Sequence, residues 1–344
     1  MKNFKHYIAL ITIIIAFQAN AQTFKTANDY LTFISDQQEL VTKNMWKYTK
    51  AVAHSKSPRS ISGKRNTLLK SMQRGITKIE KAQGFEGDDY KNKVLTHMRL
   101  NENLLKQDYA KIIDLKEVAE QSYDFMEAYI LAQELADKKM AEAQEQYEKD
   151  FYAFAAKHNI NIIESESDLG KKMKISNQVF DHKNDLYLVF FKVYINEVYL
   201  WEAIETGDIN AIQQNSNALK QTATEGLEIL KEQKLYKNDK AIVVATKATF
   251  DFFIDEATNK IPQLTDFLIL NEDLKSIKAT LDKTPEKKRT KAQIDGFNKK
   301  VKAVNKKLDA YNKTNNALNL ARQKVLNRLN NTNANFLSRH IPKD

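Results

Sequence analysis

Glycine and proline are scarce in this chain, which has 344 residues but only 8 Gly and 4 Pro. Tight turns depend on these two residue types, so a fold of many short strands lacks the turn formers that it needs. Apolar residues instead recur at three- and four-residue spacing over most of the chain, which is the period of an amphipathic helix. We therefore expect an all-α protein, long enough for one large or two medium-sized domains.

The chain also lacks cysteine, which excludes disulfides, thiolate metal sites, cysteine nucleophiles and haem attachment. The glycine-rich nucleotide-binding motifs, the Gly-x-Ser-x-Gly motif and the His-Glu-x-x-His motif are absent from the sequence. No histidine after residue 21 has a glutamate three residues before it, as the ligand pairs of a di-iron bundle require. The sequence therefore predicts a non-enzyme with no catalytic residues, no cofactor and no metal ligands.

The first 21 residues have the pattern of a secretory signal peptide. Lys2 and Lys5 precede an apolar run over 7–17, and small residues follow at 19–21. A membrane helix needs ~20 apolar residues, and neither this run nor any later one is that long. We expect export, cleavage before Gln22 and a location in the periplasm, at the outer surface or outside the cell, without a transmembrane segment. An N-terminal core helix is the alternative.

Capping residues divide the rest of the chain into helices. The expected helices of the first half cover 28–55, 58–84 and, in two pieces with a break near Asp114, 90–158. The polar stretch 161–177 is expected to be a linker. The expected helices of the second half cover 184–207, 208–234, a long helix opened by 237–239, and a final helix that follows Thr284-Pro285 and ends near Ser338.

Residues of the first half recur in the second half at similar offsets. The pairs are Trp46 with Trp201 at 155, Gly75 with Gly226 at 151, the segments 85–88 and 236–239 at 151, and His158 with His340 at 182. We interpret this as a tandem duplication of a four-helix-bundle unit, with a first bundle over 22–160 and a second over 178–344. The larger last offset places about 31 additional residues around 270–305. A superhelical stack of helical hairpins is the alternative.

Positive charge is concentrated in one segment. The formal net charge is +10, or +8 without Lys2 and Lys5, and residues 283–313 alone contain eleven basic and three acidic residues. Six apolar residues from Ile294 to Tyr311 follow a 3-4-3-4-3 spacing, which predicts one apolar stripe on a helix of a lengthened hairpin over about 270–313.

The lysines of this hairpin have two interpretations: a solvated face that maintains solubility, or a binding site for polyanions. The polyanions considered are lipopolysaccharide, acidic glycan, DNA and a membrane surface. No nucleic-acid-binding motif accompanies the charge, so sequence-specific recognition is not expected. The candidate polyanion-binding residues are Lys287, Lys288, Arg289, Lys291, Lys299, Lys300, Lys302, Lys306 and Lys307.

The stretches Asn-Asp-Tyr-Leu at 28–31 and Trp-Lys-Tyr-Thr-Lys-Ala-Val-Ala-His-Ser at 46–55 resemble a family of exported, mostly helical surface proteins found in Bacteroidetes and leptospiral spirochaetes. The resemblance covers most of the chain after the signal peptide. It implies a surface location and implies no activity or catalytic residues.

We therefore expect a protein of the cell envelope or cell surface that acts by contact, with a polyanion or a surface protein as its partner. Two other classes remain open: a metal-binding or enzymatic bundle whose site is assembled from separate helices, and a structural spacer or oligomer.

Overall fold

The computed structural model describes residues 23–343 apart from 56, 109–118, 120 and 164–166. Every regular element in this part of the chain is helical, which confirms the expected all-α class. The expected signal peptide at 1–21 and the expected break near Asp114 lie outside the described residues. Among the described helices, none combines the length and the apolar character that crossing a membrane requires.

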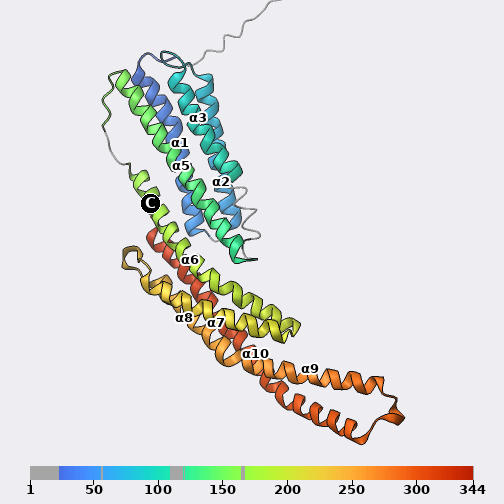
Figure 1. Ribbon diagram of the computed structural model, residues 1–344. Coiled ribbons are helices and arrows are strands. Elements are labelled where there is room, and N and C mark those ends of the chain that lie inside the picture. The colour runs from blue at the N-terminus through green and yellow to red at the C-terminus, as the bar shows by residue number, and fades with distance from the viewer. Residues whose placement is uncertain (1–22, 56, 109–118, 120, 164–166, 344) are drawn as a thin grey trace, which may run out of the picture.

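The first half forms a bundle of four long helices (Figure 1). Its core is a cluster of aromatic and aliphatic side chains that includes Tyr30, Leu68 and Phe154. The elements are α1 (Ala27–His54), α2 (Pro58–Lys81), α3 (Asp89–Asn103), the π-helix η1 (Leu104–Asp108) and α5 (Tyr123–Lys157).

The second half is a longer helical assembly with its own core, in which Leu200, Phe250 and Phe336 are buried. The C-terminal part of α1, with Trp46 and Ala53, packs against α6 and α10 and so joins the two halves. The elements are α6 (Asp168–Thr206), α7 (Ile209–Glu232), the 3-10 turn η2 (Tyr236–Asn238), α8 (Ala241–Asp255), the π-helix η3 (Glu256–Lys260), α9 (Ile261–Lys283), the 3-10 turn η4 (Glu286–Lys288) and α10 (Lys291–His340).

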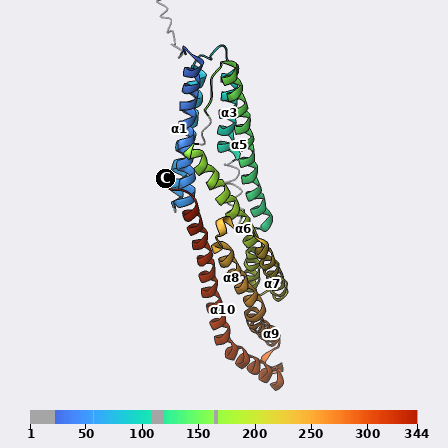
Figure 2. The same ribbon diagram turned by 90° about the vertical axis from the view of Figure 1, so that its left-hand side faces the viewer.

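The whole molecule is elongated, and the outer parts of α9 and α10 extend beyond the second core as a two-helix arm (Figures 1 and 2). Among the described elements, the outer parts of α9 and α10 have only each other as neighbours at the far end of the molecule (Figures 1 and 2). The arm coincides with the lengthened hairpin expected over about 270–313. It exposes a large surface in proportion to its small interior.

Two expected boundaries differ from the structure. Helix α6 begins at Asp168, where the Ser167 hydroxyl accepts a hydrogen bond from the Gly170 amide at 3.0 Å, so most of the expected linker at 161–177 is helical. The last helix begins after Thr290, whose capping box is closed by Gln293. The expected cap at Thr284-Pro285 instead leads into η4.

Two glycines sit at close contacts between helices. A Cβ on Gly226 of α7 would lie 2.6 Å from a ring carbon of Phe250, whereas a Cβ on Gly75 of α2 would lie 3.0 Å from the terminal methyl of Met98. The Phe250 ring is fully buried and cannot move aside, whereas the Met98 methyl ends a flexible side chain.

We therefore expect Gly226→Ala to lower the free energy of unfolding by about 1–3 kcal/mol through overpacking. Gly75→Ala is expected to be close to neutral, because the higher helix propensity of alanine offsets a small shift of Met98. Urea denaturation of both variants measures the difference. Equal costs, or a larger cost at Gly75, would contradict this account of the Phe250 contact.

Candidate functional site

The two helices of the arm are antiparallel, and their register is defined by two ion pairs. Lys300 Nζ lies 2.8 Å from Asp273 Oδ2, and Lys307 Nζ lies 4.0 Å from Asp266 Oδ2. The partners are seven residues apart on each helix, which is two turns and places both pairs on the same side of the hairpin. The interior between the helices is apolar, with the rings of Phe267 and Tyr311 4.4 Å apart.

The apolar stripe expected on α10 is narrower than its spacing suggests. Val304 is buried, and Phe297 and Val301 are half-buried. Ile294 and Leu308, at 44% and 39% exposed, lie at the edges of the stripe and are largely in solvent. A two-helix arm has no third helix to cover these edges.

Three of the nine candidate polyanion-binding residues already have partners within the arm. Lys300 and Lys307 form the ion pairs with α9. The Arg289 guanidinium donates from Nε to the carbonyl oxygens of Leu281 and Thr284 at 3.1 and 3.0 Å, and so satisfies the end of α9. Arg289 and Lys300 are therefore engaged within the hairpin, whereas Lys307 is paired but remains largely exposed.

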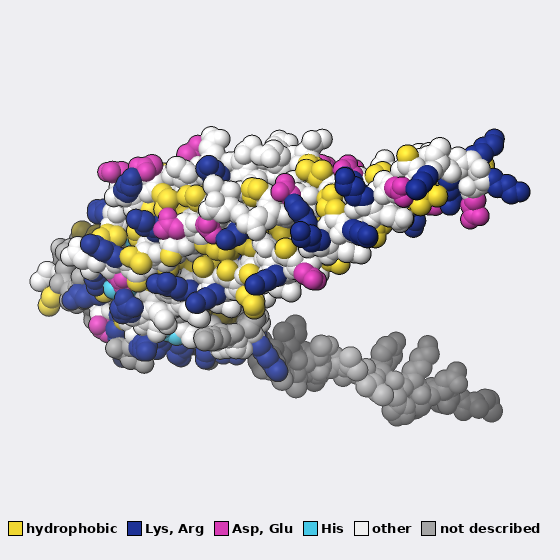
Figure 3. Space-filling model, turned by 90° about the horizontal axis from the view of Figure 1, so that it is seen from below, with side chains coloured by type: hydrophobic (Ala, Val, Ile, Leu, Met, Phe, Trp, Pro, Cys, Tyr) yellow, Lys and Arg dark blue, Asp and Glu magenta, His cyan; other side chains and the backbone are white. Residues whose placement is uncertain are grey.

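The other six candidates are exposed, and the described residues place no carboxylate within 4.0 Å of any of their ammonium groups. At ~100° per residue, the four on α10 lie within an arc of about 80°, opposite the Val304 side of the helix. Asp295 and Asp309 share this arc. Figure 3 shows Lys and Arg side chains at the far end of the arm. The six residues, called here the lysine face, are Lys287 and Lys288 on η4 and Lys291, Lys299, Lys302 and Lys306 on α10.

A second polar feature, which no sequence pattern indicated, lies in the second core. Arg322 of α10 forms ion pairs with two glutamates: its Nε with Glu197 of α6, and its Nη2 with Glu256 Oε1 at 3.3 Å. The Trp201 indole donates from Nε1 to the same Glu256 oxygen at 3.2 Å. The guanidinium carbon lies 3.9 Å from the centre of the Trp201 ring. We call these four residues the charge cluster.

Both glutamates of the charge cluster are almost completely buried, at 2% and 0% exposed for Glu197 and Glu256. Burial, with a contribution from the Glu197 charge, raises the pKa of Glu256 to about 8. Burial also raises the pKa of Glu197, although Arg322 opposes this shift. At neutral pH the Glu256 carboxyl group is therefore mostly protonated, and the Arg322 guanidinium faces Glu197 as its nearest carboxyl partner.

Glu256 is also the first residue of the π-helix η3. A π-turn leaves a backbone carbonyl outside the regular helical bonding pattern. Here the Ser216 hydroxyl of α7 donates to the Ala257 carbonyl oxygen at 3.1 Å. This hydrogen bond connects α7 to the π-turn between α8 and α9, beside Glu256 of the charge cluster.

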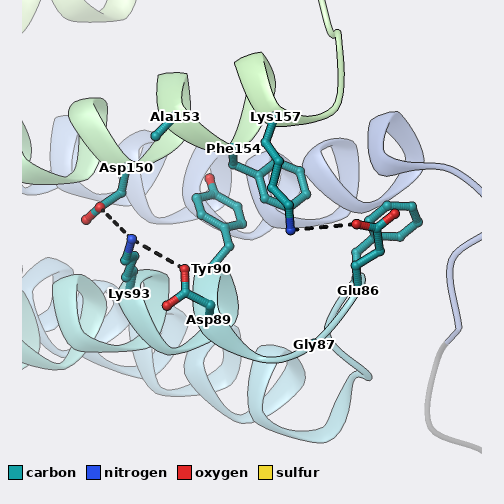
Figure 4. Close-up of a pocket in the computed structure, with 10 residues that line it drawn as sticks. Glu86, Gly87, Asp89, Tyr90, Lys93, Asp150, Ala153, Phe154 and Lys157 are labelled. Carbon is teal, nitrogen blue, oxygen red and sulfur yellow. Dashed lines mark ion pairs between the residues drawn. The ribbon is translucent and has the colours of Figure 1, made fainter.

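A shallow cavity of about 160 Å³ lies at one end of the first bundle (Figure 4). Lys93 lies between Asp150 and Asp89, at 3.3 and 3.4 Å, and Lys157 lies 3.6 Å from Glu86. Both lysines that line the cavity are thus paired with carboxylates, and the three carboxylates exceed the two lysines by one charge.

The described residues do not bring three or more His, Asp or Glu side chains together in a group suited to a metal ion. Comparison of the chain with protein-family models, with curated proteins and with solved structures finds no match in any of the three. The lysine face and the charge cluster are therefore interpreted from their own chemistry.

Proposed function

We propose that this chain is an exported, non-enzymatic binding protein of the cell envelope, and that the lysine face of its α9–α10 arm binds polyanions. The observation that carries the proposal is the exposure of six lysines, none in an ion pair with a described residue, at the end of a projecting arm. The signal-peptide pattern and the family resemblance of 28–31 and 46–55 support export and a surface location.

The spacing of the lysine face favours a polymer over a small anion. Lys291 and Lys306 are fifteen residues apart, which corresponds to about 22 Å along the helix. A single phosphate or carboxylate cannot span this distance, whereas lipopolysaccharide, an acidic glycan or DNA presents repeated charges over it. The four lysines of α10 lie along the exposed side of one helix, so we expect recognition that is electrostatic and independent of sequence.

We also propose that the two halves arose by duplication of a four-helix unit. In the first half the rings of Phe85 and His158 are 5.2 Å apart at 78°. In the second half the rings of Tyr236 and His340 are 5.2 Å apart at 81°. The sequence offsets relate Phe85 to Tyr236 and His158 to His340. The same ring contact therefore occurs at the end of each bundle.

Two backbone features support the same proposal. Glu86 and Lys237, related by the 151-residue offset, both have positive φ, at 50° and 47°. The π-helices η1 and η3 begin at Leu104 and Glu256, directly after two helices of 15 residues each. On this proposal the arm belongs to the second unit alone. The lysine face is therefore not part of the four-helix unit that the two halves share.

The test is the salt dependence of binding to heparin and to double-stranded DNA, measured by fluorescence anisotropy on the chain from Gln22. Six phosphate or sulfate contacts imply an affinity loss of about 10³-fold between 50 and 200 mM salt, because bound counterions are released. Changing all six lysines of the lysine face to glutamine is expected to weaken binding at 50 mM salt at least 100-fold and to flatten the salt dependence.

The matched control changes six exposed lysines outside the arm to glutamine, with the same loss of net charge. If the control loses as much affinity as the lysine-face variant, binding follows net charge and the proposed site is wrong. A parent chain that binds neither polymer at 50 mM salt would also contradict the proposal. The control residues are Lys64, Lys70, Lys78, Lys220, Lys234 and Lys247.

A further inference from the structure

An open cavity of about 270 Å³ lies between the helices of the first bundle, and four of the eleven residues that line it are methionines. Each of the four long helices contributes one: Met45 from α1, Met72 from α2, Met98 from α3 and Met140 from α5. The chain has only 7 methionines including Met1, and the remaining two, Met126 and Met173, lie elsewhere. Four methionines from four helices therefore line one space.

This space differs from an ordinary methionine-rich core because one side of it is open to solvent. Met72 and Met98 are buried at 3% exposed each, whereas Met45 and Met140 are half-buried. Thr42 and Gln144 at the rim are exposed. A small ion can therefore enter from solvent and reach the thioethers.

One imidazole also lines the cavity, and its tautomer is defined by its neighbours. His97 Nδ1 lies 3.1 Å from the carbonyl oxygen of Ala143, which only accepts, so Nδ1 carries the proton. His97 Nε2 is then an acceptor, and Asn101 Nδ2 donates to it at 3.1 Å. A backbone carbonyl on one ring nitrogen is the arrangement that commonly orients a metal-binding histidine.

The remaining lining residues are uncharged, and none is acidic or basic. Ca²⁺, Mg²⁺ and Mn²⁺ prefer carboxylate and carbonyl oxygens, whereas thioethers and imidazole suit Cu(I). A monovalent ion also needs less negative charge from its ligands than a divalent ion does. The other lining residues are Gln38, Val41, Thr42, Asn101, Gln144 and Tyr147.

We propose that this methionine cavity is a binding site for Cu(I), with His97 Nε2 and thioethers of the surrounding methionines as ligands. Methionine side chains are flexible and can turn their sulfur atoms toward the ion without movement of the backbone. Asn101 releases Nε2 by rotating its amide into the cavity. The site is independent of polyanion binding, because it lies in the first bundle and the lysine face lies on the arm of the second.

The first test is an anaerobic competition for Cu(I) supplied as its coloured bicinchoninate complex. The chain from Gln22 is expected to remove one Cu(I) per molecule. The variant Met72→Leu, Met98→Leu, Met140→Leu, which nearly conserves side-chain volume, is expected to bind at least 100-fold more weakly. His97→Gln tests the imidazole separately and is expected to weaken binding at least tenfold.

The matched control is Met126→Leu with Met173→Leu, which removes the two methionines outside the cavity. This control should bind Cu(I) like the parent. A parent that fails to remove Cu(I) from bicinchoninate, or a control that loses as much affinity as the cavity variant, overturns the proposal.

A second measurement uses the unaltered cavity and does not depend on the folding of a variant. The chain is labelled with ¹³C-methyl methionine and titrated with Ag(I), a redox-inert ion with similar ligand preferences. The methyl signals of the four cavity methionines are expected to shift with one equivalent, while those of Met126 and Met173 remain in place. Equal shifts of all methionine signals would show that the cavity is not the site.

Discussion

Arg322→Gln is expected to lower the free energy of unfolding by about 3–5 kcal/mol at neutral pH, because it leaves a buried carboxylate without its cation. The Arg322 side chain is only 18% exposed, and the side chains of its partners Glu197 and Glu256, taken without their backbones, are 3% and 0% exposed. In such an environment, removal of one ion-pair partner leaves the other charge buried with nothing to compensate for its lost hydration, and this lowers stability. Trp201 also loses the guanidinium stacked on its ring.

Urea denaturation monitored by circular dichroism measures this cost. The control is Arg328→Gln, which removes an exposed arginine from the same helix and is expected to change stability by less than ~0.5 kcal/mol. Replacing Glu197 and Arg322 together by Gln and Met should recover most of the stability, because a whole buried ion pair is often close to neutral against apolar packing. Similar costs for Arg322→Gln and Arg328→Gln would show that the charge cluster does not stabilise the second core.

Glu256→Gln is expected to stabilise the protein at pH 8–9 and to have little effect at pH 4–5. The pKa of Glu256 is raised from 4.5 to about 8 in the folded chain. Between these values the folded protein retains a proton that the unfolded chain has released, so stability falls as pH rises, by up to ~1.4 kcal/mol per pH unit. The glutamine amide keeps an oxygen for Trp201 and Arg322 but has no proton to lose.

The measurement is the free energy of unfolding of parent and variant at pH 5, 7 and 9. Histidines titrate in the same range, but their contribution cancels in the difference between the two proteins. Glu205→Gln, at an exposed carboxyl of the same helix as Glu197, should give a curve parallel to that of the parent. Parallel curves for Glu256→Gln as well would mean that Glu256 is already ionised in the folded protein at neutral pH.

Local sequence signals located many helix ends correctly. Ser57-Pro58 predicts the start of α2, and Gly207-Asp208 predicts the break between α6 and α7, where Gly207 adopts φ 73° and the Asp208 side chain accepts from the Ala211 amide. These signals depend on neighbouring residues only. Thr284-Pro285 has the same local pattern, but the Arg289 side chain satisfies the end of α9 and delays α10 to Lys291.

The charge cluster depends on packing between distant segments, so local patterns do not reveal it. Arg322 is 125 residues from Glu197 and 66 from Glu256. One signal was available: Glu197 is a lone acid whose neighbours three and four positions away, from Val193 to Trp201, are all apolar or aromatic. Likewise, only the register of α9 against α10 separates the paired lysines Lys300 and Lys307 from the exposed Lys299 and Lys306.

Helix α10 runs without interruption from the charge cluster to the lysine face. Arg322 and Lys291 are 31 residues apart on it, which corresponds to about 47 Å. Over this length of helix, a tilt of about 5° at Arg322 moves Lys291 by about 4 Å. The packing around Arg322 and the contacts between α9 and α10 together position the lysine face.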